Sequence, residues 1–170
     1  AVSVAVTRVL EARGVSIKDH AAYVAGHSLG EYSALCAAGT FSLGDAARLL
    51  KIRGQAMQQA VPVGQGAMAA ILGLDLETVL SAAADASQGE VCGVANDNAP
   101  GQVVISGHVG AVNRAIELLK AAGAKRALPL PVSAPFHCAL MRPAADAMEE
   151  ALSKVTMNAP VVPVVANVIA

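Results

Sequence analysis

A serine between two glycines, placed after a short apolar run and before a helix-like stretch, is the feature that most limits the fold of this chain. The pentapeptide is Gly26-His27-Ser28-Leu29-Gly30, with apolar residues at 21–25 and a helix-like stretch at 31–38. The order strand, sharp turn, helix predicts a nucleophile elbow, in which small glycines let the chain turn tightly and expose the serine hydroxyl. The helix start faces the developing oxyanion, and the Leu29 N–H is the nearest donor. The alternative is an ordinary glycine-rich turn.

Composition is consistent with a globular chain that has a single-domain amount of core. The 170 residues are 55% hydrophobic, and 12 basic residues face 13 acidic ones. This balance gives no charge excess to hold a nucleic acid or an anionic membrane. No apolar run approaches the roughly 18 residues of a membrane span, so cytoplasm is the expected compartment. The three cysteines, Cys36, Cys92 and Cys138, predict reduced thiols and neither a disulfide framework nor a metal site.

The periodicity predicts an α/β protein with a small insertion. Before the insertion the pattern predicts a helix over 1–13 and a second helix that runs to about residue 60 and is opened by a capping box of Ser42 and Asp45. After the insertion it predicts a helix over 142–154 and a last strand over 161–168. Between them, residues 66–130 predict strand, helix, strand, strand, helix, strand, which is the ferredoxin-like arrangement. The elbow therefore belongs to a larger α/β body, residues 1–62 and 130–170, interrupted by a small subdomain, residues 63–129.

A sheet of this kind could instead bind RNA by stacking bases on aromatic side chains of its strands. The chain has two tyrosines and two phenylalanines, Tyr23, Tyr32, Phe41 and Phe136, and none lies in the predicted insertion. Without stacking residues or basic charge, nucleic acid is not an expected partner.

Arg53 stands in the middle of the apolar face of the predicted helix that ends near residue 60. A guanidinium keeps its charge, so this position is costly unless the group is paired, and its fork suits a carboxylate. A ligand carboxylate is one partner. An internal ion pair, or a buried stem with its head in water, are the alternatives.

A serine nucleophile also needs a base, and the chain has four histidines. His20 and His108 are in settings where solvent or capping roles suffice. Adjacent residues on such a turn point in different directions, so we expect His27 to have a packing or orienting role beside Ser28. His137 remains, on a proline-framed loop where the chain leaves the predicted insertion. A surface loop histidine is the alternative, and no acidic partner for His137 stands out.

Together these segments resemble bacterial malonyl-CoA:acyl carrier protein transacylases across essentially the whole chain. The resemblance is carried by residues 26–32, the Arg53 helix, residues 96–107 and residues 124–141. It implies an α/β-hydrolase-like large subdomain, a ferredoxin-like small one and an active site between them.

The resemblance also implies roles for individual residues. Ser28 looks like the acyl-accepting nucleophile, His137 like its base and Leu29 like an oxyanion donor, while Arg53 looks like the clamp for the malonyl carboxylate. Phe136 resembles the malonyl-selecting form of its loop, with core packing as the alternative. The implied reaction moves malonyl from malonyl-CoA, a coenzyme A thioester, to the phosphopantetheine thiol of acyl carrier protein in fatty acid biosynthesis. We expect no cofactor and no metal. We expect the protein to be a monomer.

Two parts of the family pattern do not map onto this chain. The first is an N-terminal Gly-Gln-Gly segment, and the second is a C-terminal glutamine that orients the histidine. Gly64-Gln65-Gly66 follows the Arg53 helix, so we do not take it as the N-terminal segment. We therefore expect the central portion of a longer polypeptide, and activity from that polypeptide rather than from these residues alone. A serine hydrolase and a non-catalytic binding module are the competing interpretations.

Overall fold

The computed structural model describes residues 1–169, which divide into two compact units. The first unit comprises residues 1–54 and the residues from 148 onward, and the second comprises residues 55–147. The division falls within two helices, α4 (Leu43–Ala60) and α7 (Arg142–Ser153), so both helices contribute residues to each unit. Helices and strands are mixed along the chain, which confirms the predicted α/β class.

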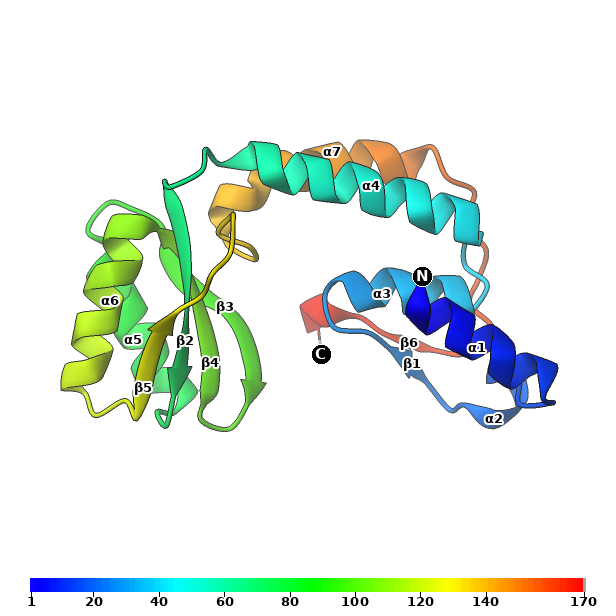
Figure 1. The fold of residues 1–170 in the computed structure, drawn as a ribbon, viewed down its shortest axis with the longest axis horizontal. Coiled ribbons are helices and arrows are strands. Elements are labelled where there is room, and N and C mark those ends of the chain that lie inside the picture. The colour runs from blue at the N-terminus through cyan, green and yellow to red at the C-terminus, as the bar shows by residue number, and fades with distance from the viewer. Residues whose placement is uncertain (170) are drawn as a thin grey trace. The chain divides into compact units, whose positions relative to one another are not determined.

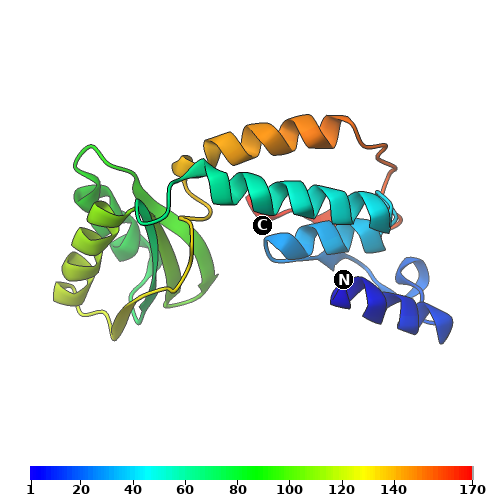
Figure 2. The same cartoon turned by 45° about the horizontal axis from the view of Figure 1, so that its top comes forward.

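The first unit combines helices with one pair of short parallel strands. β1 (Val24–Ala25) pairs with β6 (Val164–Val165), as Figure 1 shows. Besides its parts of α4 and α7, the unit contains α1 (Val2–Ala12), α2 (Ile17–His20), α3 (Leu29–Ala37) and the 3-10 turn η2 (Asn167–Ile169). α1 packs against α3 (Figure 2). Parallel strands end at the same edge, so the segments that follow β1 and β6 come together there.

A small apolar cluster fixes α4 within the first unit. Phe41, Leu49 and Met148 are buried in it, and Tyr32 packs against it. The start of α4 is set by Ser42, whose Oγ accepts a hydrogen bond from the Asp45 N–H at 3.0 Å and donates to the Asp45 carboxylate at 2.6 Å. The predicted capping of this helix by Ser42 and Asp45 is therefore confirmed.

The second unit contains one antiparallel sheet with two helices on one of its faces (Figure 1). The strand order is β3-β4-β2-β5. Along the chain the elements are β2 (Gly66–Leu72), α5 (Leu76–Ser87), β3 (Cys92–Ala99), β4 (Gln102–His108), α6 (Val109–Ala121) and β5 (Arg126–Pro129). This is the order of elements expected from the periodicity of residues 66–130.

The core of the second unit lies between that sheet and its helices. Ile71 and Ile105 project from the sheet, and Val79, Val112 and Leu119 project from the helices; all five are buried. Burying a side chain of this size stabilises the fold by about 1.5 to 3 kcal/mol. This packing explains why short apolar runs in the strands and a helical apolar period in α5 and α6 were sufficient to predict these elements.

The strands of the first unit were predicted less well. β1 is confined to Val24–Ala25 of the predicted strand 21–25, and β6 to Val164–Val165 of the predicted strand 161–168. The prediction is wrong for the end of the latter segment, because Asn167 begins η2. The length of a paired strand depends on the strand beside it, which the hydrophobic pattern does not reveal. The short elements α2, η2 and η1 (Ala139–Met141) were not predicted.

Candidate active site

Ser28 lies at the turn between β1 and α3, in a backbone conformation that serine rarely adopts. Its φ is +52° and its ψ is −107°. It is the residue that precedes α3, yet its side chain makes no capping hydrogen bond to that helix. The hydroxyl is therefore not consumed in capping, and the strained backbone is the geometry expected of a nucleophile elbow.

Gly26 explains how the chain turns so sharply. A Cβ added to Gly26 would lie 2.1 Å from the carbonyl carbon and oxygen of Gly30, so only glycine fits. A Cβ added to Gly30 would meet no described atom within 4 Å. The two glycines of the pentapeptide are therefore not equivalent, because the close approach of the backbones needs only the first to lack a side chain.

The first N–H groups of α3 follow the serine directly. The Gly30 N–H donates to the His27 carbonyl and the Glu31 N–H donates to the Ser28 carbonyl, at 2.9 and 3.1 Å. Leu29 is the first residue of the helix, and a helix leaves its first N–H groups without intrahelical partners. The Leu29 N–H is therefore at the end of α3 that favours negative charge.

Arg53 reaches Ser28 within the first unit. Its Nη2 donates a hydrogen bond to the Ser28 Oγ at 2.9 Å, and the side chain is half-buried. No ion pair among residues 1–169 involves Arg53, so the internal ion pair considered from sequence is absent from the described part of the chain. The structure thus brings together the two site residues that lie 25 positions apart.

The Tyr32 ring contacts the Arg53 side chain. The guanidinium carbon lies 5.9 Å from the centre of the Tyr32 ring, within the range of a cation–π contact. The ring in turn packs at 6.4 Å from the Phe41 ring. Burial raises the pKa of the Tyr32 phenol, and the Arg53 charge opposes this shift. Sequence reasoning had named Tyr32 among the aromatic residues and within the resemblance, and had given it no role beside Arg53.

A residue from the other end of the chain also reaches the elbow. The Ser28 N–H donates to Asn167 Oδ1 at 2.6 Å, and Asn167 Nδ2 donates to the Gly26 carbonyl at 2.8 Å. The Asn167 N–H donates to Glu31 Oε2 at 3.2 Å. Sequence reasoning missed Asn167. Its position at the end of an apolar run was the only available signal, and that run was interpreted as strand throughout.

His137 lies in the second unit, on a loop that is anchored on both sides. Its φ is +58°, again a left-handed value outside glycine. The Pro135 ring is buried, and a Cβ on Gly66 at the start of β2 would lie 2.3 Å from Pro135 Cγ. The Cys138 Sγ donates to the Pro135 carbonyl at 3.2 Å. These contacts fix the backbone on which the exposed His137 is carried.

Further contacts hold the same loop to the second unit. The Ser133 Oγ donates to Gln58 Oε1 at 2.9 Å. Phe136 packs against a cluster formed by the buried residues Val61, Ala134 and Met141. Core packing, the alternative considered for Phe136, is therefore observed within this unit.

The sequence model for the family described as "Acyl transferase domain" matches residues 1–169. The chain belongs to this family. Malonyl CoA-acyl carrier protein transacylase of Escherichia coli K12 is 57% identical over 98% of the chain and 53% of its own length. A crystal structure of acyl-carrier-protein-S-malonyltransferase from Bartonella henselae is 58% identical with a TM-score of 0.95, over 98% of the chain and 53% of that protein.

A further solved structure contains a malonyl-transacylase in complex with a type II PKS acyl-carrier protein. It is 50% identical with a TM-score of 0.93, over 97% of the chain and 52% of that protein. The acyl transferase domain sequence described here spans about half the length of the curated relatives it matches.

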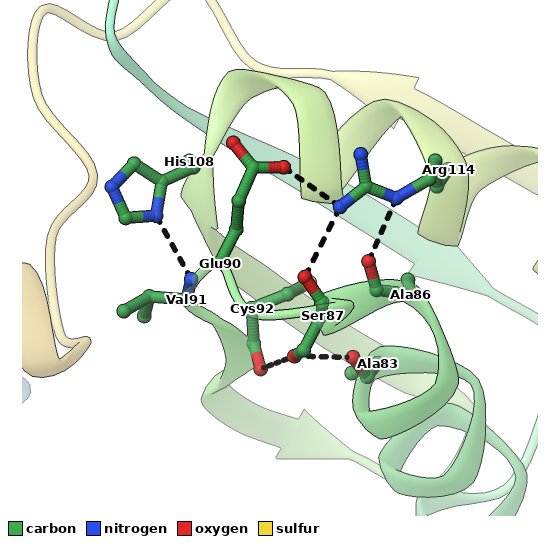
Figure 3. A network of polar contacts seen from close by, with 8 residues as sticks. All are labelled: Ala83, Ala86, Ser87, Glu90, Val91, Cys92, His108 and Arg114. Atoms are coloured by element: carbon green, nitrogen blue, oxygen red, sulfur yellow. Dashed lines mark hydrogen bonds and ion pairs between the residues drawn. The ribbon is translucent and has the colours of Figure 1, made fainter.

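Two other histidines of this acyl transferase domain make local contacts. His20 Nδ1 lies 3.1 Å from the Ser16 carbonyl at the end of α2. His108 Nδ1 accepts the Val91 N–H at 2.8 Å (Figure 3). His108 was expected in a solvent or capping role. It precedes α6 but its side chain does not cap that helix. It holds the start of β3 instead.

The three cysteines of the acyl transferase domain form no disulfide within the described residues. Cys36, Cys92 and Cys138 are free thiols, as predicted, and burial raises the pKa of Cys36 and Cys92. No helix among the described residues is long and apolar enough to cross a membrane.

Proposed function

We propose that this domain transfers malonyl groups from malonyl-CoA to acyl carrier protein through a malonyl ester of Ser28. The observation that carries the proposal is the hydrogen bond from Arg53 Nη2 to the Ser28 Oγ, 2.9 Å long, by a guanidinium with no carboxylate partner in residues 1–169. A fixed cation beside a nucleophile favours an acyl group that carries its own negative charge. The names of the relatives described above support the same substrate.

In the first half of the reaction, the Ser28 hydroxyl attacks the thioester carbonyl of malonyl-CoA. We assign His137 as the base that takes the hydroxyl proton. The Leu29 N–H, at the start of α3, stabilises the oxyanion. The bond from carbon to sulfur then breaks, and coenzyme A leaves with the proton from His137. A malonyl ester of Ser28 remains.

In the second half, the phosphopantetheine thiol of acyl carrier protein attacks that ester. His137 takes the thiol proton and returns it to the Ser28 oxygen as the ester bond breaks, which completes a ping-pong cycle. All covalent chemistry is carried by side chains and substrates, so we propose that no cofactor or metal takes part. The acyl-carrier protein bound to a related malonyl-transacylase supports this choice of partner.

Arg53 and Phe136 supply selectivity in this proposal. An acetyl group lacks the carboxylate, so acetyl-CoA would leave the half-buried guanidinium without an anionic partner. We assign Phe136 to crowding the α-methyl of methylmalonyl-CoA, a role that is compatible with its packing against Ala134 and Met141. Phe136→Ala should therefore raise the rate with methylmalonyl-CoA relative to malonyl-CoA.

We also propose the finer architecture and setting of the protein. The antiparallel sheet with two helices on one face supports a ferredoxin-like subdomain, residues 63–129. The parallel strand pair with a serine elbow supports an α/β-hydrolase-like body formed by residues 1–62 and 130–170. A cytoplasmic monomer that serves fatty acid biosynthesis is the corresponding setting.

The decisive experiment is incubation of the full-length protein with isotopically labelled malonyl-CoA, followed by intact-mass measurement and peptide mapping. We expect one malonyl adduct on Ser28, absent from Ser28→Ala, which disappears when acyl carrier protein bearing phosphopantetheine is added. Release of free malonate without carrier would identify a hydrolase. Absence of any adduct would contradict the proposed function.

A further inference from the structure

The side chain of Asn167 forms hydrogen bonds to the two residues that flank His27, namely Gly26 and Ser28. Its Oδ1 accepts the Ser28 N–H at 2.6 Å and its Nδ2 donates to the Gly26 carbonyl at 2.8 Å. His27 lies between these two backbone groups. One amide side chain thus pairs with a backbone N–H and a backbone carbonyl, as the backbone of a neighbouring strand would, although β1 has already ended at Ala25.

At neutral pH the amide side chain of Asn167 satisfies both groups at once. The Ser28 N–H needs an acceptor and the Gly26 carbonyl needs a donor, so the two contacts fix which end of the Asn167 amide carries oxygen. An aspartate would place a second oxygen against the Gly26 carbonyl, and leucine would provide neither bond. The pairing therefore suits an amide and suits neither a charged carboxylate nor an aliphatic side chain.

The helix that follows the serine closes the arrangement. Glu31, in the first turn of α3, accepts the Asn167 N–H at 3.2 Å. Asn167 is delivered by β6, which runs parallel to β1, so the residues after both strands meet at one edge. The backbone and the side chain of Asn167 together tie Gly26, Ser28 and Glu31, which lie before, at and after the turn.

The backbone conformation of Ser28 requires stabilisation by contacts such as those of Asn167. A φ of +52° at Ser28 is unfavourable for a residue with a Cβ and persists only where the surroundings hold it. The bond to Asn167 also occupies the Ser28 N–H. The N–H group that remains next in sequence at the turn is that of Leu29, which the proposed mechanism uses for the oxyanion.

We propose that Asn167 is a positioning residue for the nucleophile, which fixes the peptide planes on either side of His27 and thereby the direction of the Ser28 Oγ. This inference rests on the proposed function for its consequence in acyl transfer. Because Asn167 is exposed, its hydrogen bonds compete with water, and its removal should disturb the geometry of the serine more than the stability of the fold.

The test compares Asn167→Asp and Asn167→Leu with the wild type in the full-length protein. The matched control is Asn158→Asp, an equal chemical change at an exposed residue of the same unit whose backbone N–H bond to the Thr40 carbonyl is kept. Two rates are measured: modification of Ser28 by a fluorophosphonate probe, which needs no acyl substrate, and malonyl transfer. Thermal unfolding and circular dichroism establish that each variant is folded.

We expect both Asn167 variants to react with the probe about 10- to 100-fold more slowly, the size of effect that a small misplacement of a reacting group produces. The loss in malonyl transfer should fall on kcat, with KM nearly unchanged. The deficit of Asn167→Asp should shrink as pH is lowered toward the ordinary carboxyl pKa of about 4. A protonated carboxyl can again donate to the Gly26 carbonyl. Asn158→Asp should behave as the wild type does.

Probe rates within twofold of the wild type in folded variants would overturn the proposal, as would no reaction of wild-type Ser28. If both variants fail to fold, amide hydrogen exchange in the wild type decides: slow exchange of the Ser28 N–H supports the tie, and fast exchange overturns it. A wild type that reacts with the probe but forms no malonyl adduct would contradict the proposed function alone.

Discussion

Arg53 Nη2 donates a hydrogen bond to the Ser28 Oγ at 2.9 Å, which joins α4 to the turn before α3. The guanidinium thus contacts the side chain that we propose as the nucleophile. In the proposed reaction a substrate carboxylate is a stronger acceptor than a hydroxyl and would draw the guanidinium away from the Oγ. The same side chain would then select the substrate and release the nucleophile for attack.

Arg53→Ala should lower kcat/KM for malonyl transfer by about 100-fold, because two charge-assisted hydrogen bonds to the substrate carboxylate are lost. Acetyl transfer should change far less, since acetyl has no carboxylate to lose. The control is Arg48→Ala on the same helix, where Arg48 is exposed and pairs with Asp45. Steady-state rates with both acyl-CoA substrates test this, and equal losses for malonyl and acetyl would contradict it.

Gly26→Ala should abolish most of the activity while Gly30→Ala should not. The new methyl group at residue 26 would lie 2.1 Å from the Gly30 backbone, so the turn must open and Ser28 must move. We expect a loss of about 100-fold or more in the rate of Ser28 acylation. At residue 30 the added methyl meets nothing described within 4 Å. Acylation rates of the two variants decide, and equal rates would contradict the steric argument.

Arg114 should stabilise the second unit through the network in Figure 3. Its Nε donates to the Ala86 carbonyl at 2.9 Å, and its Nη2 donates to the Ser87 carbonyl at 3.1 Å and to Glu90 at 2.7 Å. These bonds satisfy carbonyls at the end of α5. Arg114→Met should therefore lower the free energy of unfolding by about 1 to 3 kcal/mol.

Chemical denaturation measures that loss. Arg126→Met provides the control, since Arg126 is exposed on β5 and takes no part in this network. A loss for Arg114→Met no larger than that for Arg126→Met would show that the network contributes nothing.

Asp75 should make the second unit sensitive to acid. Its carboxylate caps α5 by accepting the Thr78 N–H at 2.7 Å, and this bond lowers the pKa of Asp75. Because the pKa is lowered in the folded state, the charged carboxylate stabilises the fold above the unfolded-state pKa of about 3.9. That contribution is lost as pH falls through the folded-state pKa.

Asp75→Ala should accordingly lower Tm near neutral pH, and its difference from the wild type should shrink on acidification. Asp85→Ala, at an exposed position of the same helix, is the control. Thermal unfolding measured from about pH 7 to about pH 3 tests the prediction around the ordinary carboxyl pKa. A difference that stays constant over this range would contradict the assigned role of the charge.

Backbone strain marks the predicted catalytic residues independently of their chemistry. Among the described residues other than glycine, positive φ values occur at Ser28, Gln88 and His137. The positive φ of Gln88 is explained by its position as the C-cap of α5, where helices commonly end in a left-handed residue. The other two are the proposed nucleophile and base, and strained residues that cap no helix end are concentrated at functional sites.

The second unit was predicted well because its elements are specified locally. The apolar periods of α5 and α6, the short apolar runs of β2 and β4, and the capping of α5 by Asp75 all act over a few residues. The parallel strands of the first unit are specified by a partner about 140 residues away, so their lengths were overestimated. Arg53 was recognised as misplaced on an apolar face, yet only the structure identified Ser28 as its partner.

The sequence by itself determined where the chain turns and which side chains have reactive chemistry, because glycine spacing, helix period and proline act on neighbouring residues. The serine, the histidine and the arginine were all recognisable in this way. Only the tertiary structure decided that Asn167 and Arg53 converge on Ser28 from segments 139 and 25 residues away. Such contacts arise when parallel strands end at a common edge and a cluster packs α4 beside the turn, and neither leaves a local pattern.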